Sequence, residues 1–217
     1  IYAVVYSYTN MGAEKLISNP LGLAVLGVLL VRPMHPYDIA STLREWHKHE
    51  SIKIRYGSLY TVVDKLHSLG FIEPVEKERE GNRPERTIYA ITNAGKNYFY
   101  SWLEDLLANP VKEYTQLGAG LSFIATLSPE KALGLIAKRV DRLRDIVRAM
   151  KTQERVLRKQ GLERLFILEL EYEIVLKEAE LNWLEGIYKD IKEGKLEGID
   201  AWRSWHRQSL VRDREGK

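Results

Sequence analysis

Apolar residues recur at intervals of three and four along the first third of the chain, and this spacing predicts helices. The first helix should run from about Pro20 to Val31, because proline suits a first helical turn and Pro33 prevents the helix from continuing. A second helix should begin at His35-Pro36 and reach about Trp46.

The third predicted helix covers residues 57–69 and has two unlike faces. One face is an apolar stripe made of Leu59, Val62, Val63, Leu66 and Leu69. The opposite face presents Gly57, Tyr60, Thr61, Asp64 and Ser68, with Lys65 at its edge. Gly70 then supplies the residue that commonly ends such helices. Just before this helix, residues 51–54 alternate polar and apolar side chains, which predicts a short strand.

Two extended segments follow, at residues 71–77 and 86–91, and both are predicted strands. The intervening sequence EREGNRPE is too polar to pack in a core, so it should be an exposed loop. Thr92-Asn93 can cap a fourth helix that ends near Leu107. This order is typical of a winged helix-turn-helix, a DNA-binding arrangement in which the loop is the wing.

The second half of the chain is predicted to be long helices. Ser128-Pro129-Glu130 is a strong helix start, with a capping serine, a proline in the first turn and an acid near the positive end of the dipole. The apolar positions that follow alternate spacings of three and four, broken only at Glu154, which predicts a coiled-coil seam: Leu133, Ile136, Val140, Leu143, Val147, Met150 and Leu157. Gly161 interrupts the seam, and a partner helix should run from about Leu162 to Ile191.

This partner helix carries two apolar stripes. One consists of Leu165, Leu168, Tyr172, Val175 and Ala179. The other, on a neighbouring face, consists of Phe166, Leu170, Ile174, Leu181 and Leu184. One antiparallel helix cannot cover both, and large exposed apolar patches are rare on monomers. A homodimer interface on the second stripe is therefore predicted.

The expected fold is mainly helical with a minor β component. An extension at residues 1–19 should precede a winged helix-turn-helix at residues 20–108. A connection at 109–127, which shows no clean period, should lead to an antiparallel, coiled-coil-like dimerisation domain at 128–217. The first ten residues are β-prone and receive no functional weight.

Composition bounds the cellular setting and the chemistry. The 217 residues include no cysteine, which excludes disulfides and thiolate zinc sites and fits a reducing cytoplasm. The longest apolar run, residues 21–31, is far shorter than the roughly 20 residues needed to cross a bilayer. No export signal opens the sequence, so a cytoplasmic location is expected. A formal charge of +3 permits a nucleic-acid partner without demanding one.

The third helix and its surroundings hold the candidate contacts to double-stranded DNA. Hydroxyl groups and a lysine on the polar face suit base reading, and cations before the helix and in the wing suit phosphate contacts. The candidates are Lys53, Arg55, Tyr56, Ser58, Tyr60, Thr61, Lys65, Arg83 and Arg86. Asp64 on the reading face and several glutamates around the wing should keep the electrostatic affinity of each subunit modest.

Several motifs resemble the PadR family of transcriptional regulators. They are the run GSLYTVVDKLHSLGFIE, the wing sequence GNRPERTIYAIT with the following NAGK, and HPYDI at the start of the second helix. SPEKALGLI and EYEIVLKEAELNWLEGI are similar to the helical carboxy-terminal domain of the longer subfamily. The resemblance implies a homodimer, more often a repressor than an activator, released from DNA by a small and often aromatic effector. Arg55-Tyr56 stands where the family usually has Ser-Pro, and Pro36 replaces a glycine.

An effector site would need an apolar pocket, and five aromatic residues could line one between the domains: Tyr98, Trp102, Tyr114, Phe123 and Trp183. Packing in a core or interface explains each of them about as well. The sequence contains no Gly-rich phosphate loop, no G-x-S-x-G and no H-E-x-x-H, so neither an enzyme nor a cofactor or metal site is predicted. The alternative function is a winged-helix module that binds a protein partner and no DNA.

Overall fold

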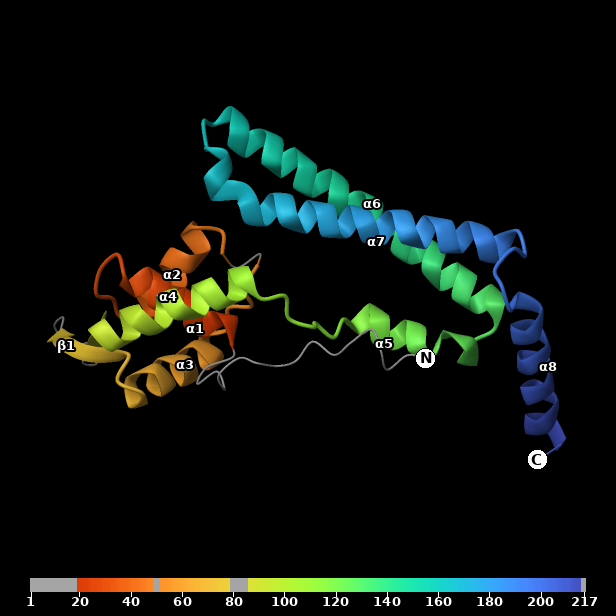
Figure 1. Ribbon diagram of the computed structural model, residues 1–217, viewed down its shortest axis with the longest axis horizontal. Helices are drawn as coiled ribbons and strands as arrows, with labels where there is room; N and C mark the ends of the chain where they lie inside the picture. The colour runs from red at the N-terminus through yellow and green to blue at the C-terminus, as the bar shows by residue number, and fades with distance from the viewer. Residues whose placement is uncertain (1–18, 49–50, 79–85, 216–217) are drawn as a thin grey trace. The chain divides into compact units, whose positions relative to one another are not determined.

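The computed structural model describes residues 19–48, 51–78 and 86–215, and the chain forms two compact units (Figure 1). The first unit covers residues 1–113 and the second covers residues 114–217. Within the described residues, no helix is both long and apolar enough to cross a membrane.

The first unit follows the predicted order of elements. It contains α1 (Pro20–Leu29), α2 (Pro36–Glu45), α3 (Tyr56–Ser68), β1 (Ile72–Glu78), β2 (Arg86–Ile91) and α4 (Asn93–Ala108). Side chains just before three of the helices cap them: Asn19 accepts from the Leu21 amide at 3.0 Å, His35 from Tyr37 at 3.1 Å, and Thr92 from Gly95 at 3.1 Å. Each cap satisfies a backbone amide that the helix itself leaves unpaired.

The hydrophobic core of the first unit is built around α1. Six α1 residues are buried, and α2, α3, α4 and β2 all pack on this helix. The predicted apolar stripe of α3 supplies Leu59, Val62, Val63 and Leu66 to the same core. Because these four side chains fix which side of α3 is covered, the polar side of the helix must face outward.

The β-structure of the first unit is an antiparallel pair of strands. β1 and β2 pair from Ile72 opposite Ile91 to Glu78 opposite Arg86, with a bulge between Pro74 and Glu76. An isolated bridge adds Met34 to the edge of β2, because Met34 and Tyr89 exchange two backbone hydrogen bonds of 3.0 and 3.1 Å.

The predicted strand at residues 51–54 is wrong. This segment is a turn followed by irregular backbone, and it forms no ladder with β1 or β2. Met34 occupies the bridging position beside β2 instead. The alternation reflects Ile52 and Ile54, which are half-buried against the core without pairing as a strand.

Two glycines in the first unit meet backbone requirements. Gly70 has φ of 71°, a left-handed conformation that glycine adopts without steric cost, and it ends α3. Gly95 lies in the first turn of α4 against the backbone of Phe71. A Cβ at position 95 would lie 2.0 Å from the Phe71 carbonyl oxygen, so only glycine fits there.

The second unit consists of helices. They are α5 (Gln116–Ser122), the 3-10 turn η1 (Ile124–Thr126), α6 (Pro129–Lys159), the 3-10 turn η2 (Arg164–Ile167), α7 (Leu168–Lys192) and α8 (Ile199–Glu215). Ser128 caps α6 through the Lys131 amide at 3.2 Å, as its sequence predicts. The expected connection at 109–127 contains the short helix α5, whose seven residues are too few to show a period. The partner helix starts at Leu168, later than the predicted Leu162, because η2 precedes it.

α6 and α7 form the predicted antiparallel hairpin (Figure 1). Ile136, Val140 and Leu143 of α6 share a core with Leu184 and Ile191 of α7. α8 joins this core through Ile199, and the indole N–H of Trp202 donates to the Leu127 carbonyl at 2.8 Å.

The two stripes of α7 face the opposite way from the prediction. Leu170, Ile174 and Leu184, which were assigned to a dimer interface, are buried within the chain, and Leu181 is partly buried there. The exposed stripe is the one made of Leu165, Leu168, Tyr172, Val175 and Ala179. Only Phe166 among the five predicted interface residues is exposed.

The close approach at Gly95 provides a stability test. Gly95→Ala should destabilise the first unit by about 1–3 kcal/mol, the usual cost of overpacking, because the new methyl group collides with the Phe71 carbonyl. Gly134→Ala is the matched control: position 134 lies in α6 with no atom within 4 Å of the added Cβ, so this variant should be neutral or slightly stabilising. Thermal unfolding followed by circular dichroism compares them. An unchanged unfolding midpoint for Gly95→Ala would contradict the packing described here.

Candidate nucleic-acid interface

The outward face of α3 gathers four of the nine predicted DNA-contacting side chains. Ser58, Tyr60, Thr61 and Lys65 are all exposed, and Tyr60 retains 44% of its surface. The Thr61 hydroxyl donates to the Gly57 carbonyl at 3.0 Å, so its oxygen remains available as an acceptor. Asp64 is exposed on the same helix, which places one negative charge on this face.

The start of α3 is suited to an anion. Arg55 is the N-cap residue, with an extended backbone (φ −122°, ψ 135°) and no side-chain hydrogen bond to the first turn. The first amides of the helix therefore have no capping side chain, and they lie at the positive end of the helix dipole. Lys53 and Arg55 are exposed immediately before it. Helix amides without a capping side chain, beside two cations, are the elements of a phosphate site.

Tyr56, the first residue of α3, is held by two side chains of α2. The Arg44 guanidinium donates to the Tyr56 hydroxyl at 2.5 Å, and its central carbon lies 4.6 Å from the centre of the Tyr56 ring. Tyr37 stacks on Tyr56 with ring centres 5.9 Å apart and an interplanar angle of 14°. We call these three residues the Tyr37–Arg44–Tyr56 cluster. The sequence analysis predicts a role for Tyr56 but not for Tyr37 or Arg44. The one sequence signal for this cluster is that Arg55-Tyr56 replaces the usual Ser-Pro at the start of α3.

The wing is described only at its base. Arg83 lies outside the described residues, and Arg86 is the first residue of β2, with a side chain that is likewise not described. On β1, Glu73 and Glu76 are exposed, which agrees with the expectation of negative charge near the wing.

The five predicted effector-binding aromatics have different environments. Tyr98 stacks on Phe71 at 4.4 Å and contacts Trp102 at 5.6 Å, and Trp102 is only 5% exposed. Packing in the core of the first unit therefore accounts for Tyr98 and Trp102. Tyr114 and Phe123 are largely exposed, and Trp183 is half exposed on α7.

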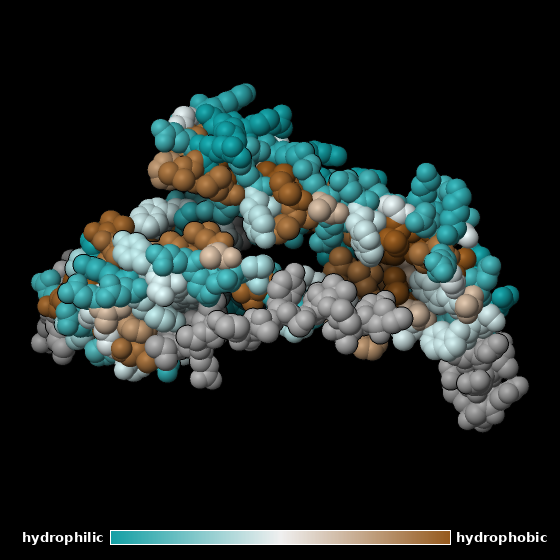
Figure 2. All heavy atoms as spheres, viewed as in Figure 1, coloured by the Kyte–Doolittle hydropathy of each residue, from teal (hydrophilic) through white to brown (hydrophobic). Residues whose placement is uncertain are grey.

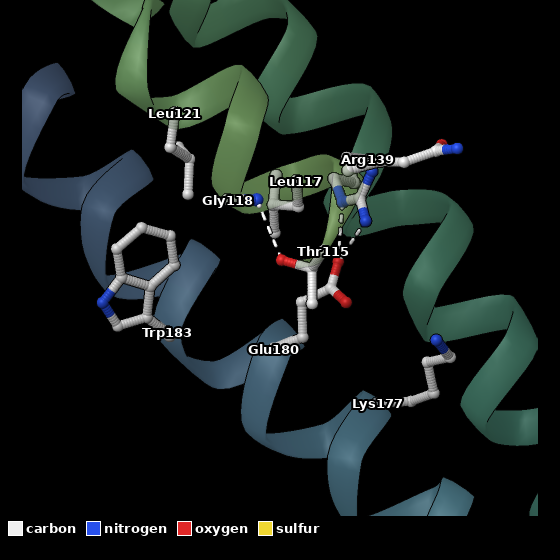
Figure 3. A pocket seen from close by; sticks show the side chains of 9 residues that line it. Thr115, Leu117, Gly118, Leu121, Arg139, Lys177, Glu180 and Trp183 are labelled. Carbon is white, nitrogen blue, oxygen red and sulfur yellow. Dashed lines mark hydrogen bonds and ion pairs between the residues drawn. The ribbon is translucent and has the colours of Figure 1, made fainter. Parts of the chain in front are cut away.

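Trp183 lines an open groove of about 510 Å³ within the second unit (Figure 3). Its walls come from α5, α6 and α7, and the lining residues are Thr115, Gln116, Leu117, Gly118, Leu121, Arg139, Lys177, Glu180 and Trp183. Arg139 is paired with Glu180 at 2.5 Å. Lys177 forms no ion pair with any residue in the described part of the chain, so the groove combines an indole, two leucines and an uncompensated ammonium group.

A second surface feature is an exposed apolar row along α7 and the turn before it. It consists of Leu165, Phe166, Leu168, Tyr172, Val175, Leu176, Ala179 and Trp183. We call this set the α7 row. Figure 2 shows hydrophobic side chains along the α6–α7 hairpin next to hydrophilic ones. Monomers usually expose apolar residues singly, whereas the α7 row brings several of them together on one helix.

Helices packed on α1, an outward polar α3 and an antiparallel strand pair together define a winged helix-turn-helix protein. Residues 25–101 match the sequence profile described as the "Transcriptional regulator PadR-like family". The matched residues lie within the first unit, and the match agrees with the resemblance of the sequence motifs.

Similar proteins of known description include regulators from Bacillus subtilis. The negative transcriptional regulator PadR of Bacillus subtilis (strain 168) is 29% identical over 132 residues, which cover 58% of this chain and 70% of that protein. The crystal structure of Bacillus subtilis PadR in complex with operator DNA has a TM-score of 0.63 and 22% identity, covering 80% of this chain and 99% of that one. The crystal structure of the same protein in complex with p-coumaric acid has a TM-score of 0.62 and 22% identity, and the match covers 79% of this chain and 98% of that one. These structures share the fold of this chain.

Proposed function

We propose that this protein is a transcriptional regulator that binds operator DNA as a homodimer through α3 and the wing. The outward polar face of α3 carries the proposal, because its first turn offers uncapped amides beside Lys53 and Arg55. Tyr60, Thr61 and Lys65 follow on the same face, where a helix lying in the major groove presents its side chains to base edges. Bacillus subtilis PadR, similar in fold, is known in complex with operator DNA, which supports this reading.

The proposed sign of regulation is repression. The relative that is 29% identical is a negative transcriptional regulator, and the sequence motifs favour the same sign. A bound dimer would then occlude a promoter until a signal releases it. A winged-helix module that binds a protein partner remains the alternative, and it requires no salt-dependent attraction to duplex DNA.

We propose that the second copy of the chain covers the α7 row. A dimer pairs the same surface of both subunits, and an exposed apolar helix face can pack against its own copy. Burying these side chains removes apolar surface from water at about 25 cal/mol per Å². The dimer interface is thus assigned to Leu168, Tyr172 and Val175 and their neighbours instead of the buried Leu170, Ile174 and Leu184.

The groove at Trp183 is the proposed effector site. A planar aromatic acid suits it, because the ring can pack on the indole and on Leu117 and Leu121 while its carboxylate pairs with Lys177. Bacillus subtilis PadR is known with p-coumaric acid, a ligand of this chemistry. Trp183 also belongs to the α7 row, so ligand and dimer contacts would meet at one residue. A ligand shifts DNA affinity only if it favours one arrangement of the dimer over another.

DNA binding is tested with duplexes that the wild-type protein selects from a random-sequence pool, alongside unselected duplexes. Tyr60→Ala should weaken binding to the selected duplexes more than to the unselected ones, because it removes a base contact. Lys53→Gln should weaken both equally and reduce the slope of log affinity against log salt by about 0.9. Anisotropy titrations at several salt concentrations measure both effects. Wild-type binding that does not fall as salt rises would remove the DNA-binding proposal and favour the protein-interaction module.

The dimer assignment is tested by Val175→Glu. Two copies of the carboxylate would be buried without partners at the proposed interface, which should weaken dimerisation by about 1–3 kcal/mol per group. Lys138→Glu, at an exposed position of α6 outside the α7 row, lowers the charge even further and should leave dimerisation unchanged if charge alone is not the cause. Sedimentation velocity over a concentration series gives the dissociation constants. A chain truncated after Asn109 should be monomeric, and a stable dimer of that fragment would place the interface elsewhere.

The effector site is tested by comparing two tryptophan variants. Trp183→Leu should weaken binding of p-coumaric acid, or of related phenolic acids, by about tenfold, equivalent to roughly 1.4 kcal/mol of lost ring packing. Trp205→Leu is the matched control, because Trp205 lies on α8 with 51% exposure against 48% for Trp183, and it does not line the groove. Calorimetric titration measures the affinities. Equal affinities for both variants and the wild type would rule out the groove as the site.

A further inference from the structure

Arg44 differs in its partners from the arginines that join α6 to α7. On the α6–α7 hairpin, Arg139, Arg144 and Arg158 all pair with carboxylates of α7. Among the described residues Arg44 pairs with no carboxylate, and its hydrogen-bond partner is the neutral hydroxyl of Tyr56. Within the described part of the chain, its positive charge is therefore held in place without a carboxylate partner.

Tyr56 fixes the guanidinium in two ways. Its hydroxyl accepts a hydrogen bond of 2.5 Å, and its ring lies under the guanidinium carbon at 4.6 Å, within the range of a cation–π contact. A guanidinium has five N–H donors, so most of them stay available after one is bound to the phenol. A held, planar and partly unsatisfied guanidinium suits bidentate contact with a phosphate.

Tyr37 supports this arrangement from the first turn of α2. It stacks on Tyr56 nearly parallel, at 14°, and both rings remain partly exposed. Stacking limits the rotamers of Tyr56, and so reduces the side-chain entropy that Arg44 would lose on binding a ligand. The cluster thus holds one cation beside the first residue of α3.

The position of the cluster indicates the ligand. Tyr56 is the first residue of α3, so its side chain ties Arg44 to the start of that helix, whose first amides have no capping side chain and directly follow the exposed Arg55. The helices α2 and α3 carry three described acidic side chains, and none of them pairs with Arg44: Asp38 and Glu45 on α2 and Asp64 on α3. A single phosphate can accept from helix amides and from a guanidinium fork together.

We propose that Arg44 is a DNA-backbone contact at the first turn of α3, and that Tyr56 and Tyr37 are positioning residues for it. This inference rests on the proposed DNA-binding function and deepens it. In this arrangement Tyr56 holds Arg44 against a phosphate of the DNA. Arg44 and Tyr37 of α2 thereby join the proposed DNA interface. Because the contact is to phosphate, it contributes equally on every duplex sequence.

The test measures salt dependence with the full-length protein, using selected and random-sequence duplexes. Arg44→Gln should lower the salt slope by about 0.9 on both duplexes. Arg44→Lys should keep the slope, because the charge remains, but should bind several-fold more weakly, because the planar fork and the stacking are lost. Arg142→Gln removes the same charge from an exposed position of α6 and should leave the slope unchanged.

The positioning role is tested by a double-mutant cycle. Tyr56→Leu should weaken DNA binding in the wild-type background and have little further effect in Arg44→Gln, because it acts through that residue. Tyr56→Phe keeps the ring and should lose less affinity than Tyr56→Leu. Circular dichroism checks that each variant is folded.

Two results separate the possible failures. If the wild type binds duplexes with a salt-dependent affinity and Arg44→Gln has the wild-type slope, the cluster only joins α2 to α3 and this inference is overturned. If the wild type itself shows no salt-dependent binding, the proposed function fails first.

Discussion

The burial of α1 is the constraint on which the first unit depends. This helix is apolar on most of its circumference, so it must be covered on several sides, and α2, α3, α4 and β2 supply the cover. α3 can bury only one stripe in doing so. The packing that stabilises the fold therefore also turns the polar stripe of α3 outward. This polar stripe is the candidate DNA-reading face, and no further interaction is needed to orient it.

The end of α3, the root of the wing and the start of α4 are joined at one point. The Thr92 hydroxyl donates to the Gly70 carbonyl at 2.7 Å, while the Thr92 amide donates to the Phe71 carbonyl at 3.0 Å. Thr92 also caps α4 through Gly95, whose missing side chain allows the Phe71 carbonyl to approach. A displacement of α4 would thus also move the end of α3, because the hydrogen bonds of Thr92 join the two helices directly.

Several helix starts in this chain could be predicted from local chemistry, whereas the choice between two faces of α7 could not be made from apolar spacing. Pro20, Pro129 and Thr92 act within their own turn, so their effect can be read from the sequence. Both stripes of α7 are similarly apolar, and a distant helix decides between them. The overlooked signal was charge: Glu171, Glu178 and Glu185 recur every seven residues and pair with Arg158, Lys151 and Arg144, which recur every seven on α6. The misplaced strand at 51–54 has a similar cause, since the partner that fills the edge of β2 is Met34, far away in sequence.

The distribution of charge pairs explains how a chain with a formal charge of only +3 can attract DNA. On α6, four cations pair with carboxylates of α7, and such exposed pairs stabilise the hairpin by at most about 1 kcal/mol each: Arg139, Arg144, Lys151 and Arg158. Around the start of α3 the described cations Arg44, Lys53 and Arg55 have no carboxylate partner. Attraction between exposed charges acts over a Debye length of about 8 Å at physiological salt, so the local arrangement outweighs the sum over the chain. Among the described residues, the unpaired cations at the start of α3 therefore place positive charge beside helix amides that have no capping side chain.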